Sequence, residues 1–247
     1  RFRTCVVDYN MGFGDVVTML DYDPRGITMS EWADDIREKL QSGMEKDCLQ
    51  YSREEIEAYL QKRSDTGLYA LLAPAHHNDS VDITAAELEI MLRNLANFGE
   101  FDFIVVDTGN DTNDATLMAM ERADEVFLVA TQDVTCAHCL ELFLQSLQSI
   151  GFNMKKVRLI INNVMSAKDT GIAVAELKES FPYPCWAIIR HDAGIIRSNN
   201  FGKPIVFSAN HDMTKQLRAI VSRLNSSDVQ ELSQSRGGFR RLFQKRG

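Results

Sequence analysis

The sequence predicts an α/β protein with a doubly wound, mostly parallel sheet, and three observations support this fold class. Short apolar segments alternate with amphipathic segments along all 247 residues, as they do where helices cover a parallel sheet. The apolar segments include continuous runs, which indicate strands buried on both faces. No internal repeat or low-complexity tract interrupts the series.

The clearest predicted strand is Phe103–Val106, which leads into a single acid, Asp107. Ligands bind at the carboxyl edge of open parallel sheets, so an acid at this point is a candidate for holding a metal. The alternative is that Asp107 merely caps the following helix. A second predicted strand, Thr4–Asp8, also ends in an acid and leads into the glycine-rich turn 9–15. If the two strands are parallel neighbours, both acids can face one site.

The first half of the chain continues with helices that begin at a serine or threonine N-cap. These predicted helices are Ser30–Leu40, Ser52–Leu60 and Thr84–Leu95. A strand is predicted over Leu68–Ala73 and is ended by Pro74. The loop after it contains His76 and His77, which would point apart on an extended chain. Because no cysteine or glutamate is placed to complete a site, the pattern does not favour a metal there.

The second half of the chain shows the same alternation of helices and strands. The predicted helices are 113–123, 134–150, 173–181, a short helix to Asn199, and 212–224; the predicted strands are 125–130, 157–161 and 187–189. Cys136 and Cys139 form a Cys-x-x-Cys pair at the start of one helix. Such a pair can be a redox site or half of a metal site, but no second pair occurs, and ordinary helix packing is the favoured interpretation.

Composition narrows the function classes. The net charge of −8 argues against nucleic-acid binding by the body of the protein, although a local basic patch could still bind it. Five cysteines without regular spacing indicate reduced thiols and a cytoplasmic protein. No apolar run is long enough to cross a bilayer. We see no internal domain boundary before residue 224.

The end of the chain differs from the rest in charge. Residues 225–235 are polar and read as a linker, and 236–247 are basic, without an acid. On a helix the apolar and basic side chains of this tail would form separate faces, as in an interfacial helix on an anionic membrane. A disordered solubilising tail is the alternative, and a tail that contacts nucleic acid is a less favoured one. The candidate membrane residues are Phe239, Arg240, Arg241, Leu242, Phe243, Lys245 and Arg246.

Several of these segments together resemble the ParA/MinD ATPases, closest to the CpaE/TadZ pilus-assembly branch. Val6–Val16 is similar to the Asp-x-Asp stretch of that family, in the Phe-Gly-Asp form of the branch, and Phe101–Asp107 is similar to its Walker B strand. Ile161–Val164 matches its adenine-side strand end, and Ile189–Val206 its closing segment. Leu71–Ala75 resembles the Leu-Pro-Ala-Pro segment of the branch, and the tail resembles the membrane-targeting helix of MinD.

The resemblance implies a homodimer that binds ATP and Mg²⁺ between its subunits and binds membrane or partners in the ATP form. By position, Asp8 would act near the Mg²⁺ and the attacking water, and Asp107 would hold the metal through water. Asn162 would contact adenine, and the loop formed by Arg190, His191 and Asp192 would lie against the base. Residues 1–224 would then form one ATPase domain. Carboxylates suit this chemistry because phosphoryl transfer needs a positioned metal rather than a nucleophilic side chain.

The sequence also departs from the family pattern. No Gly-x-x-x-x-Gly-Lys-Ser/Thr loop occurs in the 247 residues, so we expect the phosphate loop and the first, central strand to precede Arg1 in a longer protein. Asn10 stands where many relatives have the second acid of Asp-x-Asp, and slow hydrolysis is expected from an uncharged amide. Residues 108–110 replace the usual Pro-Pro, Asn163 replaces a frequent Arg, and Arg190 a frequent Pro.

These features together predict a cytoplasmic, peripherally membrane-associated ATPase that localises the assembly of a pilus or related secretion machine. One alternative is a scaffold of the same fold with weak or no turnover, which Asn10 and the lack of a phosphate loop favour. A second alternative is a DNA-partitioning ATPase of the ParA type. The acidic balance and the apolar-basic tail count against DNA.

Overall fold

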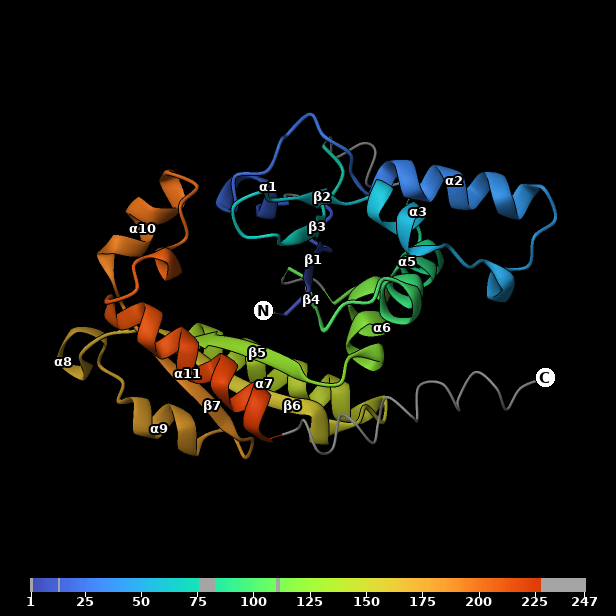
Figure 1. Ribbon diagram of the computed structural model, residues 1–247. Helices are drawn as coiled ribbons and strands as arrows, with labels where there is room; N and C mark the ends of the chain where they lie inside the picture. The colour runs from blue at the N-terminus through green and yellow to red at the C-terminus, as the bar shows by residue number, and fades with distance from the viewer. Residues whose placement is uncertain (1, 13, 76–82, 110–111, 228–247) are drawn as a thin grey trace. The chain divides into compact units, whose positions relative to one another are not determined.

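The computed structural model describes residues 2–12, 14–75, 83–109 and 112–227 of the protein. The chain divides into two compact units (Figure 1). The first contains residues 1–125 and 198–203, and the second contains 126–197 and 204–247. Each unit has its own sheet and its own apolar core, and each is described here by itself.

In the described ranges the sheet of the first unit has four strands in the order β2-β3-β1-β4. Its three long-range parallel strands are β1 (Thr4–Asp8), β3 (Tyr69–Leu71) and β4 (Phe103–Asp107). The two-residue strand β2 (Gln61–Lys62) pairs antiparallel with β3. β1 and β4 have the bounds that the sequence predicts, whereas β3 is shorter than predicted and β2 carries too little pattern to be predicted.

Capping boxes define the main helices of this unit. In each box a hydroxyl side chain accepts from a backbone N–H of the first turn, and a glutamate three residues later accepts from the backbone N–H of the cap. The boxes begin α2 (Met29–Gln41), α3 (Arg53–Ala58) and α5 (Ala85–Phe98). The predicted cap Ser30 is wrong: Thr28 is the cap of α2, because Glu31 stands three residues after it. The remaining helices are α1 (Val16–Met19), η1 (Lys46–Cys48) and α6 (Asp114–Arg122).

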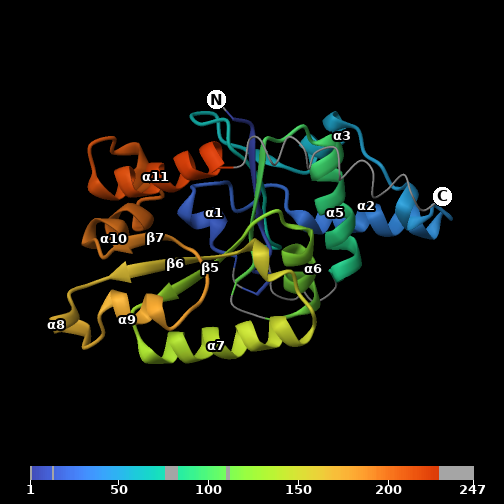
Figure 2. The same cartoon turned by 90° about the horizontal axis from the view of Figure 1, so that it is seen from below.

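The two faces of this sheet are covered unequally. Alternate residues such as Cys5 and Val7 pack with α2, α5 and α6 in the larger core. Within the described residues of this unit, the opposite face, which includes Val6 and Ala70, packs with the short α1 and the residues after it. Figures 1 and 2 show α1 on one side of the strands and α5 and α6 on the other.

The continuous apolar sequence of β4 predicts a strand buried on both faces. This prediction is wrong for the face that α1 covers in part. Val105, on the α1 face, is 52% exposed, because α1 covers β1 and β3 but does not extend over β4. Among the described strands β4 pairs with β1 on one side only. The prediction of a central strand that precedes Arg1 stays a prediction.

The second unit contains a parallel three-stranded sheet in the order β5-β6-β7. α7 and α9 cover one face with the core formed around Leu159 and Ile161, and α11 crosses the other face (Figure 2). The strands are β5 (Val126–Thr131), β6 (Val157–Val164) and β7 (Cys185–Arg190). Its described helices are α7 (Val134–Ser149), η2 (Met154–Lys156), α8 (Ala167–Thr170), α9 (Val174–Glu179), η3 (Ile205–Phe207) and α11 (Asp212–Ser227). α10 (Ala193–Asn200) begins in this unit and ends in the first.

Candidate functional site

The two acids that the sequence singles out lie side by side in the first unit. β1 and β4 are parallel neighbours, and their pairing places Asp8 opposite Asp107. The backbone continues this contact, because Tyr9 N–H donates to the Asp107 carbonyl at 2.7 Å. Both carboxylates thus stand at the carboxyl edge of the sheet, where open parallel sheets bind ligands.

The two carboxylates differ in environment. Asp107 is exposed, whereas the side chain of Asp8 is only 1% exposed. The Asp8 carboxylate accepts the N–H of Asn10 at 3.1 Å and the N–H of Val16, at the start of α1, at 3.3 Å. α1 therefore closes over Asp8 and leaves its neighbour in solvent.

Burial raises the pKa of Asp8 from 3.8 to about 6. Desolvation is the largest cause, because it disfavours the charged form. The two backbone N–H donors lower the pKa, and the negative charges of Asp107 and Asp15 raise it further. Asp8 is consequently a carboxylate that a nearby cation would stabilise in its ionised form.

Two glycines that the sequence reading did not single out shape this site. A Cβ added at Gly14 would lie 2.7 Å from Asp8 Oδ2, so only glycine lets the turn approach the carboxylate this closely. Gly109 has a φ of +63°, and a Cβ there would lie 3.3 Å from Asn10 Cγ. The turns after β1 and β4 thus meet at Asn10, next to both acids. The sequence signal for this close approach was a glycine in the turn that follows each of the two predicted strands.

A second group of predicted residues meets in the second unit. Asn162 and Asn163 lie within β6, which extends beyond its predicted end. Asn163 has a φ of +57°, and its Oδ1 lies 2.7 Å from His191 Nδ1. Asn162 Oδ1 accepts the N–H of Asn163 at 2.8 Å. The left-handed backbone of Asn163 therefore turns its side chain toward the loop that follows β7.

The loop after β7 is held by polar contacts of its own. Arg190 N–H donates to Gln216 Oε1 of α11 at 3.1 Å. Asp192 Oδ1 accepts the N–H of Gly194 at 2.8 Å, and its other oxygen lies 3.4 Å from His211 Nε2. A surface pocket of about 580 Å³ opens beside this loop; its lining residues are Val164, Met165, Ser166, Asp169, Arg190 and His191.

Gln132, which the sequence reading placed only in the polar exit of a strand, organises the loops around this pocket. It is 6% exposed, its Oε1 accepts the N–H of Met165 at 2.9 Å, and its Nε2 donates to the Ile172 carbonyl at 2.5 Å. Both ends of the buried amide are used, as a buried polar group requires. A glutamine directly after a buried strand is the only sequence signal for this role.

The remaining candidate residues either have surroundings different from these two groups or lie outside the described residues. Cys136 Sγ accepts the N–H of Thr131 at 3.2 Å, and Cys139 is exposed on α7. His76, His77 and the candidate membrane residues of the tail, from Phe239 to Arg246, lie outside the described residues. In the described ranges no three histidine, cysteine or acidic side chains gather into a metal site. No helix within those ranges has the length and apolar character to span a bilayer.

Comparison with known proteins identifies proteins of similar sequence and similar fold. No protein-family model matches the sequence. The septum site-determining protein MinD of Bacillus subtilis (strain 168) is 22% identical over 231 residues, which are 92% of this chain and 79% of that protein. A ParA family ATPase from Chlorobium tepidum TLS has a TM-score of 0.73 at 16% identity, over 90% of this chain and 86% of that chain.

A third similar protein was solved with a nucleotide. The septum site-determining protein MinD of Pyrococcus horikoshii OT3, complexed with Mg-ADP, has a TM-score of 0.71 at 16% identity, over 92% of this chain and 85% of that chain. The similarity to these two structures shows the fold. The MinD of Bacillus subtilis, found by sequence, has the same name as one of them. The protein thus has the α/β fold of the MinD and ParA ATPase structures, and its sequence is similar to that of a MinD protein.

Proposed function

We propose that this protein binds ATP with Mg²⁺ and acts as a dimerising localisation factor, in the manner of the CpaE/TadZ branch, for assembly of a pilus or related secretion machine. The observation that carries the nucleotide part is the pairing of Asp8 with Asp107 at the carboxyl edge of β1 and β4. The finer role in pilus assembly rests on the sequence resemblance of Val6–Val16 and Leu71–Ala75 to that branch.

The residues at the paired strand ends fit a magnesium ion. Mg²⁺ prefers oxygen ligands and keeps several of its waters, so one or two carboxylates with substrate phosphates are its usual protein site. The negative charge of Asp107 contributes to the raised pKa of Asp8, and a divalent cation beside both acids would relieve that repulsion. When bound, Mg²⁺ supplies charge neutralisation on the phosphate oxygens.

The side chains around this pair have distinct proposed roles. Ionised Asp8, held by the N–H groups of Asn10 and Val16, would orient a metal-bound or attacking water. Asp107, exposed beside it, would hold the metal through water. The Asn10 amide can hydrogen-bond a water but carries no charge, so turnover should be slow. In the second unit, Asn162 and the loop from Arg190 to Asp192 are proposed to contact the adenine base.

Association with a membrane is proposed for the tail. Phe239, Leu242 and Phe243 would enter the interface, while the flanking Arg and Lys side chains contact anionic headgroups. Each basic residue near such a surface contributes about 1 kcal/mol, so binding should be reversible and would keep the protein peripheral. Homodimer formation in the ATP state would double the number of tails and strengthen this attachment.

ATP binding and turnover by the complete gene product test the proposal. Mg²⁺-dependent binding should be lost in Asp107→Asn, whereas Asp114→Asn, a matched change on the exposed first turn of α6, should leave it unchanged. Failure of the unmodified protein to bind ATP at saturating Mg²⁺ would overturn the nucleotide part. ATP binding without hydrolysis would favour the scaffold alternative, which the uncharged amide of Asn10 also favours.

Co-sedimentation with anionic liposomes and with duplex DNA tests the localisation part. We expect liposome binding that Phe239→Glu abolishes without a change in the circular dichroism of the folded body. Retention on DNA without binding to liposomes would instead favour the ParA-type partitioning alternative, against which the net charge of −8 argues.

A further inference from the structure

The second unit carries a second pocket, at the end of its sheet opposite the predicted adenine contacts. Its volume is about 640 Å³, within the roughly 300–1,000 Å³ range of ligand sites. We call it the Trp186 pocket, and its lining residues are Met154, Lys155, Arg158, Pro182, Tyr183, Pro184, Trp186 and Arg223. Arg158 and Trp186 are each the second residue of a strand, whereas Asn162 and Arg190 lie toward the ends of the same strands.

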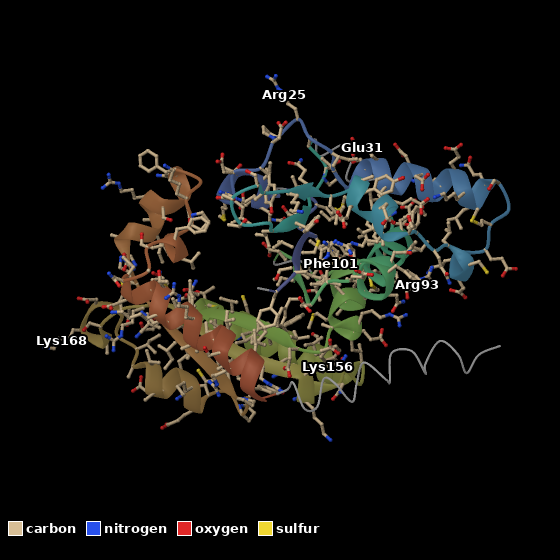
Figure 3. The ribbon with its side chains drawn as sticks, in the orientation of Figure 1. Arg25, Glu31, Arg93, Phe101, Lys156 and Lys168 are labelled. Atoms are coloured by element: carbon tan, nitrogen blue, oxygen red, sulfur yellow. The ribbon has the colours of Figure 1, made fainter. Side chains whose placement is uncertain are left out.

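Figure 3 shows this separation through two labelled lysines of the second unit. Lys156, in η2 just before β6, lies at one end of the unit, and Lys168, in α8 just after β6, lies at the other. Four residues of a strand separate Arg158 from Asn162, which corresponds to about 13 Å. The pocket is therefore separate from the proposed adenine contacts of the same unit.

Two arginines are held against the indole ring. The guanidinium carbon of Arg158 lies 5.5 Å from the centroid of Trp186, and that of Arg223, from α11, lies 5.2 Å from it. Arg223 Nη1 also donates to the Trp186 carbonyl at 2.6 Å, and Arg158 Nη1 donates to the Lys155 carbonyl at 2.5 Å. Stacking and backbone hydrogen bonds thus position both cations before any ligand arrives, which lowers the entropy cost of binding.

The ring itself is fixed by its surroundings. Trp186 is 9% exposed, and Phe127 of β5 meets it edge to face at a centroid distance of 5.3 Å. Its position at the start of β7 leaves it between the strand beginnings and α11. An indole held in this way serves as a rigid platform for the two guanidinium groups.

The charge of the pocket selects an anion. Three of its eight lining residues are cationic and none is acidic, in a chain whose net charge is −8. Arginine forks bind carboxylates and phosphates through paired N–H donors. The pocket therefore opposes the charge of the protein that carries it and suits a negatively charged group.

The remaining lining favours a peptide over a compact phosphate. Met154, Tyr183 and two prolines give the pocket broad apolar walls, which a phosphate could not use. Both guanidinium carbons lie within 5.5 Å of one ring centroid, so one short segment can reach both. Acids two residues apart on an extended chain are separated by about 6.6 Å and point to the same side.

We propose that the Trp186 pocket binds an acidic segment of a partner protein, with two carboxylates that alternate with a large apolar residue. The carboxylates engage Arg158 and Arg223, Lys155 adds long-range attraction, and the apolar residue packs against Tyr183 and the prolines. This surface gives the second unit a docking point at the end of its sheet opposite the proposed adenine contacts.

Fluorescence anisotropy of labelled peptides with the pattern acid–apolar–acid, such as Gly-Glu-Leu-Glu-Gly and Gly-Asp-Phe-Asp-Gly, tests this inference on the full chain. We expect saturable binding that Arg223→Glu and, separately, Lys155→Glu weaken at least tenfold. Arg218→Glu, the same charge reversal on an exposed residue of α11, is the matched control and should change binding less than twofold. Peptides with Gln or Asn in place of the acids should not bind.

Tryptophan emission gives a second readout. The emission of Trp186 should change when a peptide binds, whereas the emission of Trp32, fully buried in the first unit, should stay constant. The inference is overturned if no acidic peptide binds below about 1 mM, a threshold of roughly 4 kcal/mol, or if Arg218→Glu weakens binding as much as the pocket variants. Preferential binding of inorganic phosphate or duplex DNA at the pocket would also overturn it. Should Arg223→Glu unfold, Lys155→Glu decides, because within the described part of the chain the Lys155 side chain has no contact like those that Arg223 makes with Trp186.

Discussion

Replacing Asp8 by asparagine should make the protein more stable at neutral pH while removing its proposed metal function. The structure buries this carboxylate at the end of β1, under α1. Asparagine has nearly the same shape and no charge, so the variant separates the cost of the charge from the packing of the side chain. An active-site residue that lowers stability is expected where function needs a buried charge.

The magnitude follows from the pKa of Asp8, which rises from 3.8 to about 6. A shift of one pKa unit corresponds to about 1.4 kcal/mol, so the ionised side chain costs roughly 3 kcal/mol near pH 7. Asparagine keeps one acceptor and loses the second, which costs about 1 kcal/mol. The expected net gain in the free energy of unfolding is about 2 kcal/mol.

The sign of the pH dependence is also fixed. Between its ordinary pKa of 3.8 and about 6, Asp8 keeps its proton in the folded state and loses it in the unfolded state. Stability of the unmodified protein should therefore fall as the pH rises through this window. The variant lacks this slope, and its advantage should shrink to near zero at about pH 4.5.

Urea unfolding at about pH 4.5 and about pH 7 measures both quantities. In a Trp186→Phe background the emission of Trp32, in the core of the first unit, reports that unit alone. Asp107→Asn is the control, because this exposed carboxylate should change stability by less than about 0.5 kcal/mol. A variant at Asp8 that is less stable near pH 7, or that keeps the slope of the unmodified protein, would refute the reasoning.

Three further substitutions test the turns around the two groups of candidate residues. Gly14→Ala would place a Cβ 2.7 Å from Asp8 Oδ2 and should lower the free energy of unfolding in urea by about 1–3 kcal/mol; an unchanged value would mean that the turn moves aside freely. Gln132→Ala removes the buried amide that bonds Met165 N–H and the Ile172 carbonyl and should lower the free energy of unfolding by about 1 kcal/mol. Gln145→Ala, on the exposed face of α7, should leave it nearly unchanged in the same urea titration. At Asn163, with φ +57°, alanine should be less stable than glycine by about 1–2 kcal/mol, and the reverse order would contradict the strain argument.

The bounds of strands and helices were predicted best where an apolar run is followed at once by a residue that ends it. β1 and β4 are apolar runs stopped by an acid, and their predicted ends agree with the structure. The start of α2 was misplaced because Thr28 and Ser30 are both good caps. Only the position of Glu31, which closes the box with Thr28, distinguishes them.

The site was predictable in its residue types but not in its asymmetry. Acids at two strand ends could be read from the sequence, and the register that pairs Asp8 with Asp107 fits the prediction that they are parallel neighbours. The burial of one acid and the exposure of the other depend on how far α1 extends across the sheet, which is a tertiary property. Gln132 was missed for the same reason, since its two partners lie 33 and 40 residues away.

The position of β4 in the first sheet affects how the protein should behave at high concentration. Among the described strands β4 pairs with β1 alone, and β4 has no lysine, proline or bulge, the features that usually prevent one sheet edge from pairing with another molecule. A sample of the 247-residue chain in which β4 stays unpaired on this side should associate at high concentration and gain intermolecular β signal in the amide I infrared band. A lysine in place of Val105, which is 52% exposed, should raise the concentration at which light scattering first appears.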